Sequence, residues 1–194
     1  LAGGPLAPGY QQGRDYISAL ASRGSPVAAI GMAAIASKGL AYLAGAWLAG
    51  RAWPRRGLRS LLALAGLCLL VVAAFRIGCP AGPAGCGFGA AALVDDLQDR
   101  VHYWAVFGFQ LCLVLAMARL ALGLIRCAPW PRGLAWVSLL AAPLSTSLLT
   151  PTGGAANGLW QRSWAATNSL WLLLVVAGAL PALWDSERAA RAER

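Results

Sequence analysis

Charge is scarce in this chain and absent from long parts of it. Only 12% of its 194 residues are charged, against about 25% in an ordinary soluble domain, and 59% are hydrophobic. A helix of about 20 apolar residues crosses a hydrocarbon layer about 30 Å thick. No apolar stretch alternates with the period of two that a barrel strand requires. The sequence therefore predicts an all-α integral membrane protein, a helical bundle without a separate soluble domain.

Histidine is almost absent, and so are the motifs that announce common chemistries. His102 is the single histidine, whereas a metal site commonly has three or four protein ligands. No glycine-rich phosphate loop follows a strand, and no nucleophile elbow is present. We expect no metal and no cofactor, and the sequence does not identify a substrate or a reaction.

Acidic residues are also few, which leaves a net charge of +9. The basic residues form no continuous patch interleaved with aromatic side chains, so nucleic acid is not an expected partner. They flank the apolar stretches instead, as the positive-inside rule describes. Membrane lipids, and other membrane protein subunits, are the partners that this pattern favours.

Five apolar stretches are long enough to be spans, within a single domain covering 1–194. We expect the spans at about 27–49, 60–75, 101–122, 133–150 and 164–184. Ten arginines lie in 50–59, 119–132 and the tail after the last span, and five lie in the other connections. We expect a bacterial plasma membrane protein, and this bias predicts that its C-terminal tail at 185–194 is cytoplasmic.

The same bias places the N-terminal segment 1–26 and the connections 76–100 and 151–163 on the outer side. Five spans and a cytoplasmic tail put residue 1 outside as well. We therefore expect a first span before residue 1, with a cleaved signal peptide as the alternative.

Two short motifs resemble those of a known family. The first is Gly9-Tyr10 followed by Arg14-Asp15-Tyr16-Ile17-Ser18-Ala19-Leu20, and the second is Phe75-Arg76-Ile77-Gly78-Cys79-Pro80 followed by His102. They resemble the six-helix bacterial membrane family called domain of unknown function 998. The resemblance implies six helices, with the first motif following the first helix on the outer face. The layout is similar to that of the Frag/autophagy-modulator/Sfk group, which is associated with lipid handling.

Polar residues concentrate in the expected outer halves of three spans. Gln110 lies in the third span, Ser145 to Ser147 in the fourth, and Thr167 to Ser169, including Asn168, in the fifth. One interpretation is a polar vestibule that opens outward and binds a lipid or a membrane partner. The alternative is a set of hydrogen bonds between helices, worth about 0.6 kcal/mol each on average.

Lys38 lies at the centre of the first apolar stretch, where a lysine costs roughly 2.5–3.5 kcal/mol. We expect its ammonium to face the protein and to lie near Asp95, Asp96, Asp99 or main-chain carbonyls. The alternative is a span that begins later, so that Lys38 reaches the outer surface.

Two further groups are candidate site residues. Asp95, Asp99 and His102 follow helical spacing, so Asp99 and His102 could form an acid/base pair, or His102 could make a structural hydrogen bond. Arg14 and Asp15 could contact a lipid headgroup, or their segment could pack on the bundle.

Cys79 and Cys86 share a turn-rich outer loop, and we predict a disulfide between them; free thiols or a shared metal are the alternatives. Taken together, these residues favour a membrane protein that binds lipid or a partner without catalysis. A membrane enzyme acting on a lipid headgroup and an accessory subunit of a larger complex are the alternatives.

Overall fold

The computed structural model describes residues 7, 9–53, 57–78, 96–125, 129–149 and 156–192. Side chains are described throughout these ranges except at 129–131 and 182–192. The described residues form one short 3-10 helix and five α-helices, with no strand among them: η2 (Ile17–Ala21), α1 (Ala28–Ala52), α2 (Leu58–Ala74), α4 (Leu97–Leu124), α5 (Pro129–Leu149) and α6 (Asn157–Ala192). The predicted all-helical fold is confirmed.

Four of these helices are long and apolar enough to cross a membrane. They are α1, α4, the part of α5 from Arg132, and α6 as far as Pro181. The fifth, α2, is a shorter apolar helix of 17 residues, about 26 Å long at 1.5 Å per residue. Each predicted span falls on one helix. Most of the helices are longer than the predicted span because the polar residues beside the apolar run are helical too. The chain is a multi-pass membrane protein.

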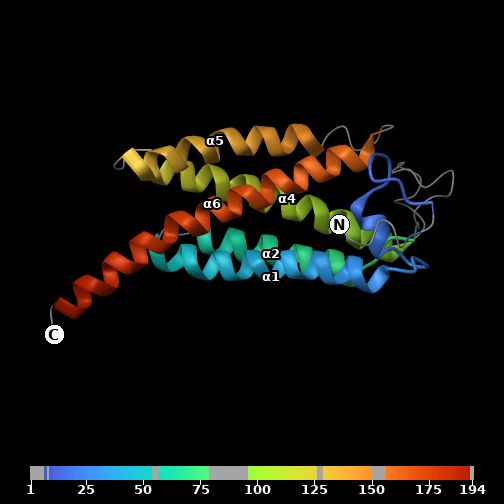
Figure 1. The fold of residues 1–194 in the computed structure, drawn as a ribbon, viewed down its shortest axis with the longest axis horizontal. Coiled ribbons are helices and arrows are strands. Elements are labelled where there is room, and N and C mark those ends of the chain that lie inside the picture. Colours follow the sequence, from blue (N-terminus) through green and yellow to red (C-terminus); the bar gives the residue numbers. More distant parts are fainter. Residues whose placement is uncertain are drawn as a thin grey trace.

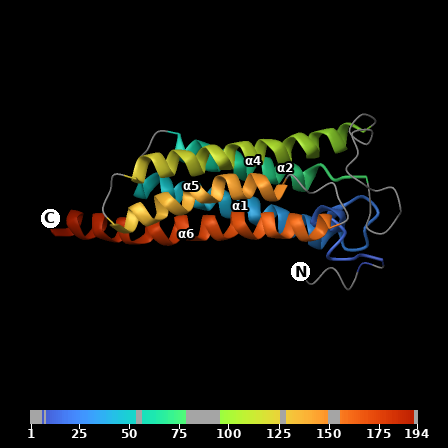
Figure 2. The ribbon, with the colours of Figure 1, turned by 90° about the horizontal axis from the view of Figure 1, so that it is seen from above.

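The helices run alternately up and down, so their ends gather at two poles (Figure 1). α1 packs on both α2 and α6, and α2 also packs on α4. α5 packs on both α4 and α6. The starts of α1, α4 and α6 lie at the pole that carries the N-terminal segment, which we call the N-terminal end. The turn at Gly57 and the C-terminus lie at the opposite pole, the C-terminal end (Figures 1 and 2).

The core lies where α1, α2, α4 and α6 meet. Tyr42, Phe109, Met117 and Trp171 are all at most 1% exposed there. The ring of Phe109 packs edge-on against Tyr42, with centroids 5.3 Å apart. Large apolar side chains also cover the outside of the bundle, where lipid would satisfy them, including Leu122 at 71% exposure, Trp104 at 70% and Leu140 at 67%.

Candidate functional site

A cavity of about 380 Å³ lies near the N-terminal end of the bundle, enclosed by η2, α1, α2, α4 and α6. Most of its wall is apolar. Its polar lining residues are Ser18, Lys38, His102, Gln161, Arg162 and Ser169. A mainly apolar pocket with a few polar groups is the usual form of a small-molecule site, and this volume lies at the lower end of the range of about 300–1,000 Å³.

Lys38 supplies the ammonium group of this cavity. Its Nζ donates a hydrogen bond of 3.1 Å to the main-chain oxygen of Ala165. It also lies 5.8 Å from the ring centroid of Phe109 and 5.7 Å from that of Trp164. Within the described part of the chain, no carboxylate lies within 4.0 Å of this ammonium. Of the expected partners, the structure shows the main-chain carbonyl.

His102 forms part of the cavity wall from α4 and is 2% exposed. Its Nδ1 lies 2.7 Å from the oxygen of Phe75 and 3.2 Å from that of Val72. Both partners are acceptors, so Nδ1 carries a proton, and Nε2 is the nitrogen that holds the lone pair when the ring is neutral. These carbonyls belong to the last turn and C-cap of α2, whose oxygens lack helical partners. This is the structural hydrogen bond that the sequence left as one alternative.

Asp99 directs its hydrogen bonds away from His102. One carboxylate oxygen accepts from the main-chain nitrogen of Gly78 at 2.8 Å, and the same oxygen lies 3.5 Å from the guanidinium of Arg23. The described residues show no hydrogen bond between Asp99 and His102, and no group of histidine, cysteine and acidic side chains able to hold a metal. An acid/base pair of these two residues therefore has no direct contact to support it.

Asp96 is the N-cap of α4 and the second partner of Arg23. Its carboxylate accepts from the main-chain nitrogen of Gln98 at 2.8 Å and forms an ion pair with Arg23. The hydrogen bond from Gln98 and then that from Arg23 lower the pKa of the Asp96 carboxyl below its ordinary value. Arg23 thus holds the two described carboxylates that were expected near Lys38.

Gln110 and Asn168 belong to a hydrogen-bonded network that joins α4, α5 and α6. Gln110 Oε1 accepts from Trp164 Nε1 at 2.8 Å and lies 3.2 Å from the hydroxyl of Ser145. Gln110 Nε2 donates to Thr146 at 3.2 Å, and Ser145 Oγ lies 2.7 Å from Asn168 Oδ1. Neither Gln110 nor Asn168 lines the cavity. They make the bonds between helices that were the alternative to a vestibule.

One polar atom in this network lacks a partner. Asn168 is 0% exposed, and its Nδ2 makes no hydrogen bond within the described part of the chain. The single hydroxyl proton of Ser145 can serve only one of the two oxygens near it. If the oxygen and nitrogen of the Asn168 amide exchange places, Nδ2 donates a hydrogen bond to Ser145 Oγ. The hydroxyl of Ser145 then donates its own hydrogen bond to Gln110 Oε1. That arrangement leaves only one carbonyl oxygen of Asn168 unpaired.

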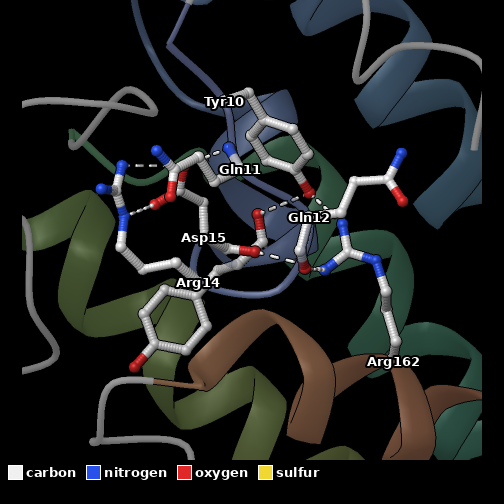
Figure 3. A network of polar contacts seen from close by, with 7 residues as sticks. Tyr10, Gln11, Gln12, Arg14, Asp15 and Arg162 are labelled. Atoms are coloured by element: carbon white, nitrogen blue, oxygen red, sulfur yellow. Dashed lines mark hydrogen bonds and ion pairs between the residues drawn. The ribbon is translucent and has the colours of Figure 1, made fainter.

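The N-terminal segment contributes Ile17 and Ser18 to the cavity wall and docks on the first turn of α6 (Figure 3). The guanidinium of Arg162 donates to the main-chain oxygen of Gln12 and the hydroxyl of Tyr10, and it lies 5.6 Å from the Tyr10 ring centroid. Gly158 and Leu159 donate their amides to the oxygens of Arg14 and Gly13, at 3.1 and 3.0 Å. These amides have no partner within the helix, so the segment caps α6.

Gly158 permits this close approach. A Cβ at that position would lie 2.5 Å from the main-chain oxygen of Asp15. Any side chain there would therefore push the segment away from α6. The docking residues come from the first motif that resembled a family, so this part of the motif has a structural role.

Arg14 and Asp15 lie in this docked segment and outside the cavity wall. Arg14 Nε is 2.9 Å from Asp15 Oδ1, and the main-chain nitrogen of Gln11 donates to Asp15 Oδ2 at 2.7 Å. Burial raises the pKa of the Asp15 carboxyl, but the bonds from Arg14 and Gln11 outweigh it and leave the pKa lowered. The segment packs on the bundle, and the Arg14 side chain stays 46% exposed.

Sequence reasoning missed much of the cavity. Ser18, Gln161 and Trp164 line it without having been candidates, because apolar and small polar residues carry no signal of a cavity until the helices are placed. Arg162 was counted only as an outer charge. Asp95, Cys79 and Cys86 lie outside the described residues, and the disulfide stays a prediction.

Comparison with known proteins identifies the family. A family model described as "Protein of unknown function (DUF998)" matches residues 1–178. A search of curated proteins and a search of solved structures each gave no match. The match covers most of the chain, including every residue of the cavity wall and of the docked segment. The chain belongs to the DUF998 family, whose function is unknown.

Proposed function

We propose that this protein binds an anionic membrane lipid and that the lipid headgroup occupies the cavity beside Lys38. The observation that carries the proposal is the Lys38 ammonium in a mainly apolar wall, with no carboxylate within 4.0 Å among the described residues. A phosphate oxygen of a lipid would supply the missing negative charge. The proposal needs no cofactor.

The Lys38 ammonium can still donate hydrogen bonds to such a ligand. An ammonium can donate three hydrogen bonds, and the carbonyl of Ala165 accepts one of them. The rings of Phe109 and Trp164 add cation–π attraction, worth up to about 2 kcal/mol in a desolvated site. Placing a lysine at the centre of an apolar span costs roughly 2.5–3.5 kcal/mol. An anion that accepts the remaining hydrogen bonds of the ammonium would offset this cost.

Ser18 adds a second polar group without a partner. It lines the cavity from η2 and is 6% exposed, and its hydroxyl makes no hydrogen bond to any of the residues that the structure describes. A headgroup oxygen within reach of Ser18 would satisfy that hydroxyl. Arg162 is different, because its guanidinium is already engaged with Tyr10, Gln12 and Gly158. We assign recognition of the anion to Lys38, and the structural docking to Arg162.

Native mass spectrometry of the detergent-purified protein tests this proposal. We expect the wild type to carry an anionic phospholipid, and Lys38→Gln to lose it. Arg51→Gln is the matched control, since Arg51 is exposed at the other end of α1, where its guanidinium lies 4.8 Å from the Trp47 ring centroid. Equal lipid retention by Lys38→Gln and the wild type would overturn the proposal.

A second candidate function is catalysis on the headgroup of the bound lipid. The observation that favours it is that His102 lines the same cavity as Lys38 and that its Nδ1 is engaged with main-chain oxygens, so Nε2 is the nitrogen that could accept a proton. His102→Asn keeps an N–H for the carbonyls of Val72 and Phe75 but removes the base. If the protein is a lipid binder alone, this variant retains unmodified lipid as the wild type does. Accumulation of a modified lipid that depends on His102 would establish the enzyme.

The orientation in the membrane is also part of the proposal. We place the N-terminal end outside and the C-terminal end in the cytoplasm of a bacterium, from the arginine bias of the connections. Gly13 and Gly133 suit a labelling test, because an added Cβ at either meets no atom within 4 Å. In whole cells, an impermeant thiol reagent should label Gly13→Cys and spare Gly133→Cys. Labelling at Gly133 alone would reverse the orientation.

A further inference from the structure

We infer that the lipid enters the Lys38 cavity sideways from the membrane, through a portal between α1 and α6 formed by Ala34 and Ala166. The inference rests on the proposed function and adds the route and the source of the ligand. It makes the ligand a lipid already in the bilayer rather than a soluble anion.

The exposure of the lining residues locates the opening. Of the fifteen described residues in the cavity wall, two are exposed, Ala34 on α1 and Ala166 on α6; the others are buried or half-buried. Both are small, so neither blocks the opening. Both also continue outward-facing apolar surfaces, since Ile30, one turn before Ala34, is 49% exposed, and Leu170, one turn after Ala166, is 60% exposed. The opening therefore faces the acyl chains.

The route from the water side is covered by the N-terminal segment. Ile17 and Ser18 of η2 form part of the cavity wall. The residues from Ser18 to Ala21 are buried, and the main-chain nitrogen of Ile17 donates to Gln161 Oε1 on α6. The contacts of Arg162 with Tyr10 and Gln12 hold the same segment in place. A soluble ligand would have to displace this segment to enter.

The path of α6 explains why the portal lies where it does. Close to the C-terminal end, α6 packs tightly on α1: a Cβ on Gly45 would lie 2.7 Å from Cδ1 of Leu172. Toward the N-terminal end the two helices separate, and the N-terminal segment lies at that end (Figure 1). Ala34 of α1 and Ala166 of α6 both line the cavity on this N-terminal side of the Gly45–Leu172 contact.

The cavity volume limits what can enter fully. A space of about 380 Å³ is of the size that holds a small molecule, and it cannot hold a whole two-chain lipid. We therefore place the phosphate beside Lys38 and the acyl chains in the portal and the surrounding bilayer. The bound state then needs no removal of the chains from the membrane.

Bulky side chains at the portal test the route. We would reconstitute delipidated protein into phosphatidylcholine nanodiscs, add photoreactive phosphatidylglycerol, and follow crosslinking over time. Ala34→Trp and Ala166→Trp should slow uptake by about tenfold or more, because about 1.4 kcal/mol in the entry barrier is already tenfold in rate. Ala33→Trp and Ala177→Trp are the controls, since both alanines are exposed on the same two helices and outside the cavity wall. They should match the wild type.

The outcomes separate this inference from the proposed function. Wild-type uptake in both portal variants, with loss of binding in Lys38→Gln, refutes the portal and leaves the lipid site in place. Unchanged binding in Lys38→Gln refutes the lipid site itself. Glycerol 1-phosphate, a soluble headgroup without chains, serves as a competitor: displacement of the bound lipid would show entry from water. Where a tryptophan lowers the unfolding temperature, Ala34→Phe and Ala166→Phe replace it.

Discussion

Gly39 and Gly66 face each other where α1 crosses α2, and neither position has room for a side chain. A Cβ on Gly39 would lie 2.9 Å from the main-chain oxygen of Gly66, and a Cβ on Gly66 would lie 2.8 Å from that of Gly39. Such close crossings of small residues are typical of helices packed in membranes. Because Lys38 directly precedes Gly39, this contact also fixes the position of the lysine in the cavity.

Gly66→Val should therefore destabilise the bundle. Overpacking commonly costs about 1–3 kcal/mol, and here the obstacle is main chain, which cannot turn away. Gly133→Val is the control, since a Cβ there meets no atom within 4 Å. Equilibrium unfolding in detergent measures both, and equal stability of the two variants would contradict the close crossing.

Arg162→Lys should release the N-terminal segment from α6. Lysine keeps the charge but cannot reproduce the fork that reaches Tyr10, Gln12 and Gly158 together. We expect faster hydrogen exchange at the amides of Gly158 and Leu159, which the segment caps. Arg14→Lys is the control, because the Arg14 side chain is 46% exposed and, among the described residues, its ion pair is with its neighbour Asp15. Unchanged exchange in Arg162→Lys would show that the fork is dispensable.

The pairing of Asp96 predicts a pH dependence of stability. Its carboxyl pKa is lowered in the folded state by the Gln98 amide and by Arg23. Its contribution is therefore complete above the unfolded pKa of about 3.9, and it is lost as the pH falls through the lower folded value. Asp96→Asn keeps an N-cap oxygen and removes the charge. The wild type should be more stable than this variant at neutral pH, and the difference should vanish in acid; a constant difference would contradict the assignment.

The network around Gln110 should be costly to break. Gln110→Leu leaves the indole N–H of Trp164 and the hydroxyl of Ser145 buried without this partner, and an unsatisfied buried donor costs about 1–3 kcal/mol. Trp164→Phe in the Gln110→Leu background removes one of those donors. The double variant should therefore lose less stability than the sum of the two single variants. Full additivity in unfolding measurements would show that the two side chains are not coupled.

The helices could be predicted from the sequence because a helix that spans a membrane needs a long apolar run, and charged residues mark its ends. The run around Lys38 predicted α1 to within a few residues, and the cost of a buried lysine predicted an ammonium facing the protein. A main-chain carbonyl was among the expected partners of Lys38, but the residue that supplies it could not be predicted, because it lies on α6, 127 positions away in sequence. A main-chain acceptor leaves no mark in the sequence.

The docked segment and the polar network show the same limit. The residues that Arg162 reaches are a phenol and main-chain oxygens, so no complementary charge pointed to them. Gln110 and Asn168 fit a vestibule and a set of bonds between helices equally well by composition. The placement of α4, α5 and α6 shows that both side chains bond to neighbouring helices, which composition alone does not indicate.

Mapping the crosslinks of a bound lipid shows whether an anionic headgroup lies beside Lys38. A phosphatidylglycerol with a photoreactive group next to the phosphate would be bound in nanodiscs, activated, and located by peptide mass spectrometry. We expect labels on the segments around Lys38 and Ala165. These labels should be lost in Lys38→Gln and kept in Arg51→Gln. Labels confined to the outward apolar surface around Leu140, unaffected by Lys38→Gln, would contradict this placement of the headgroup.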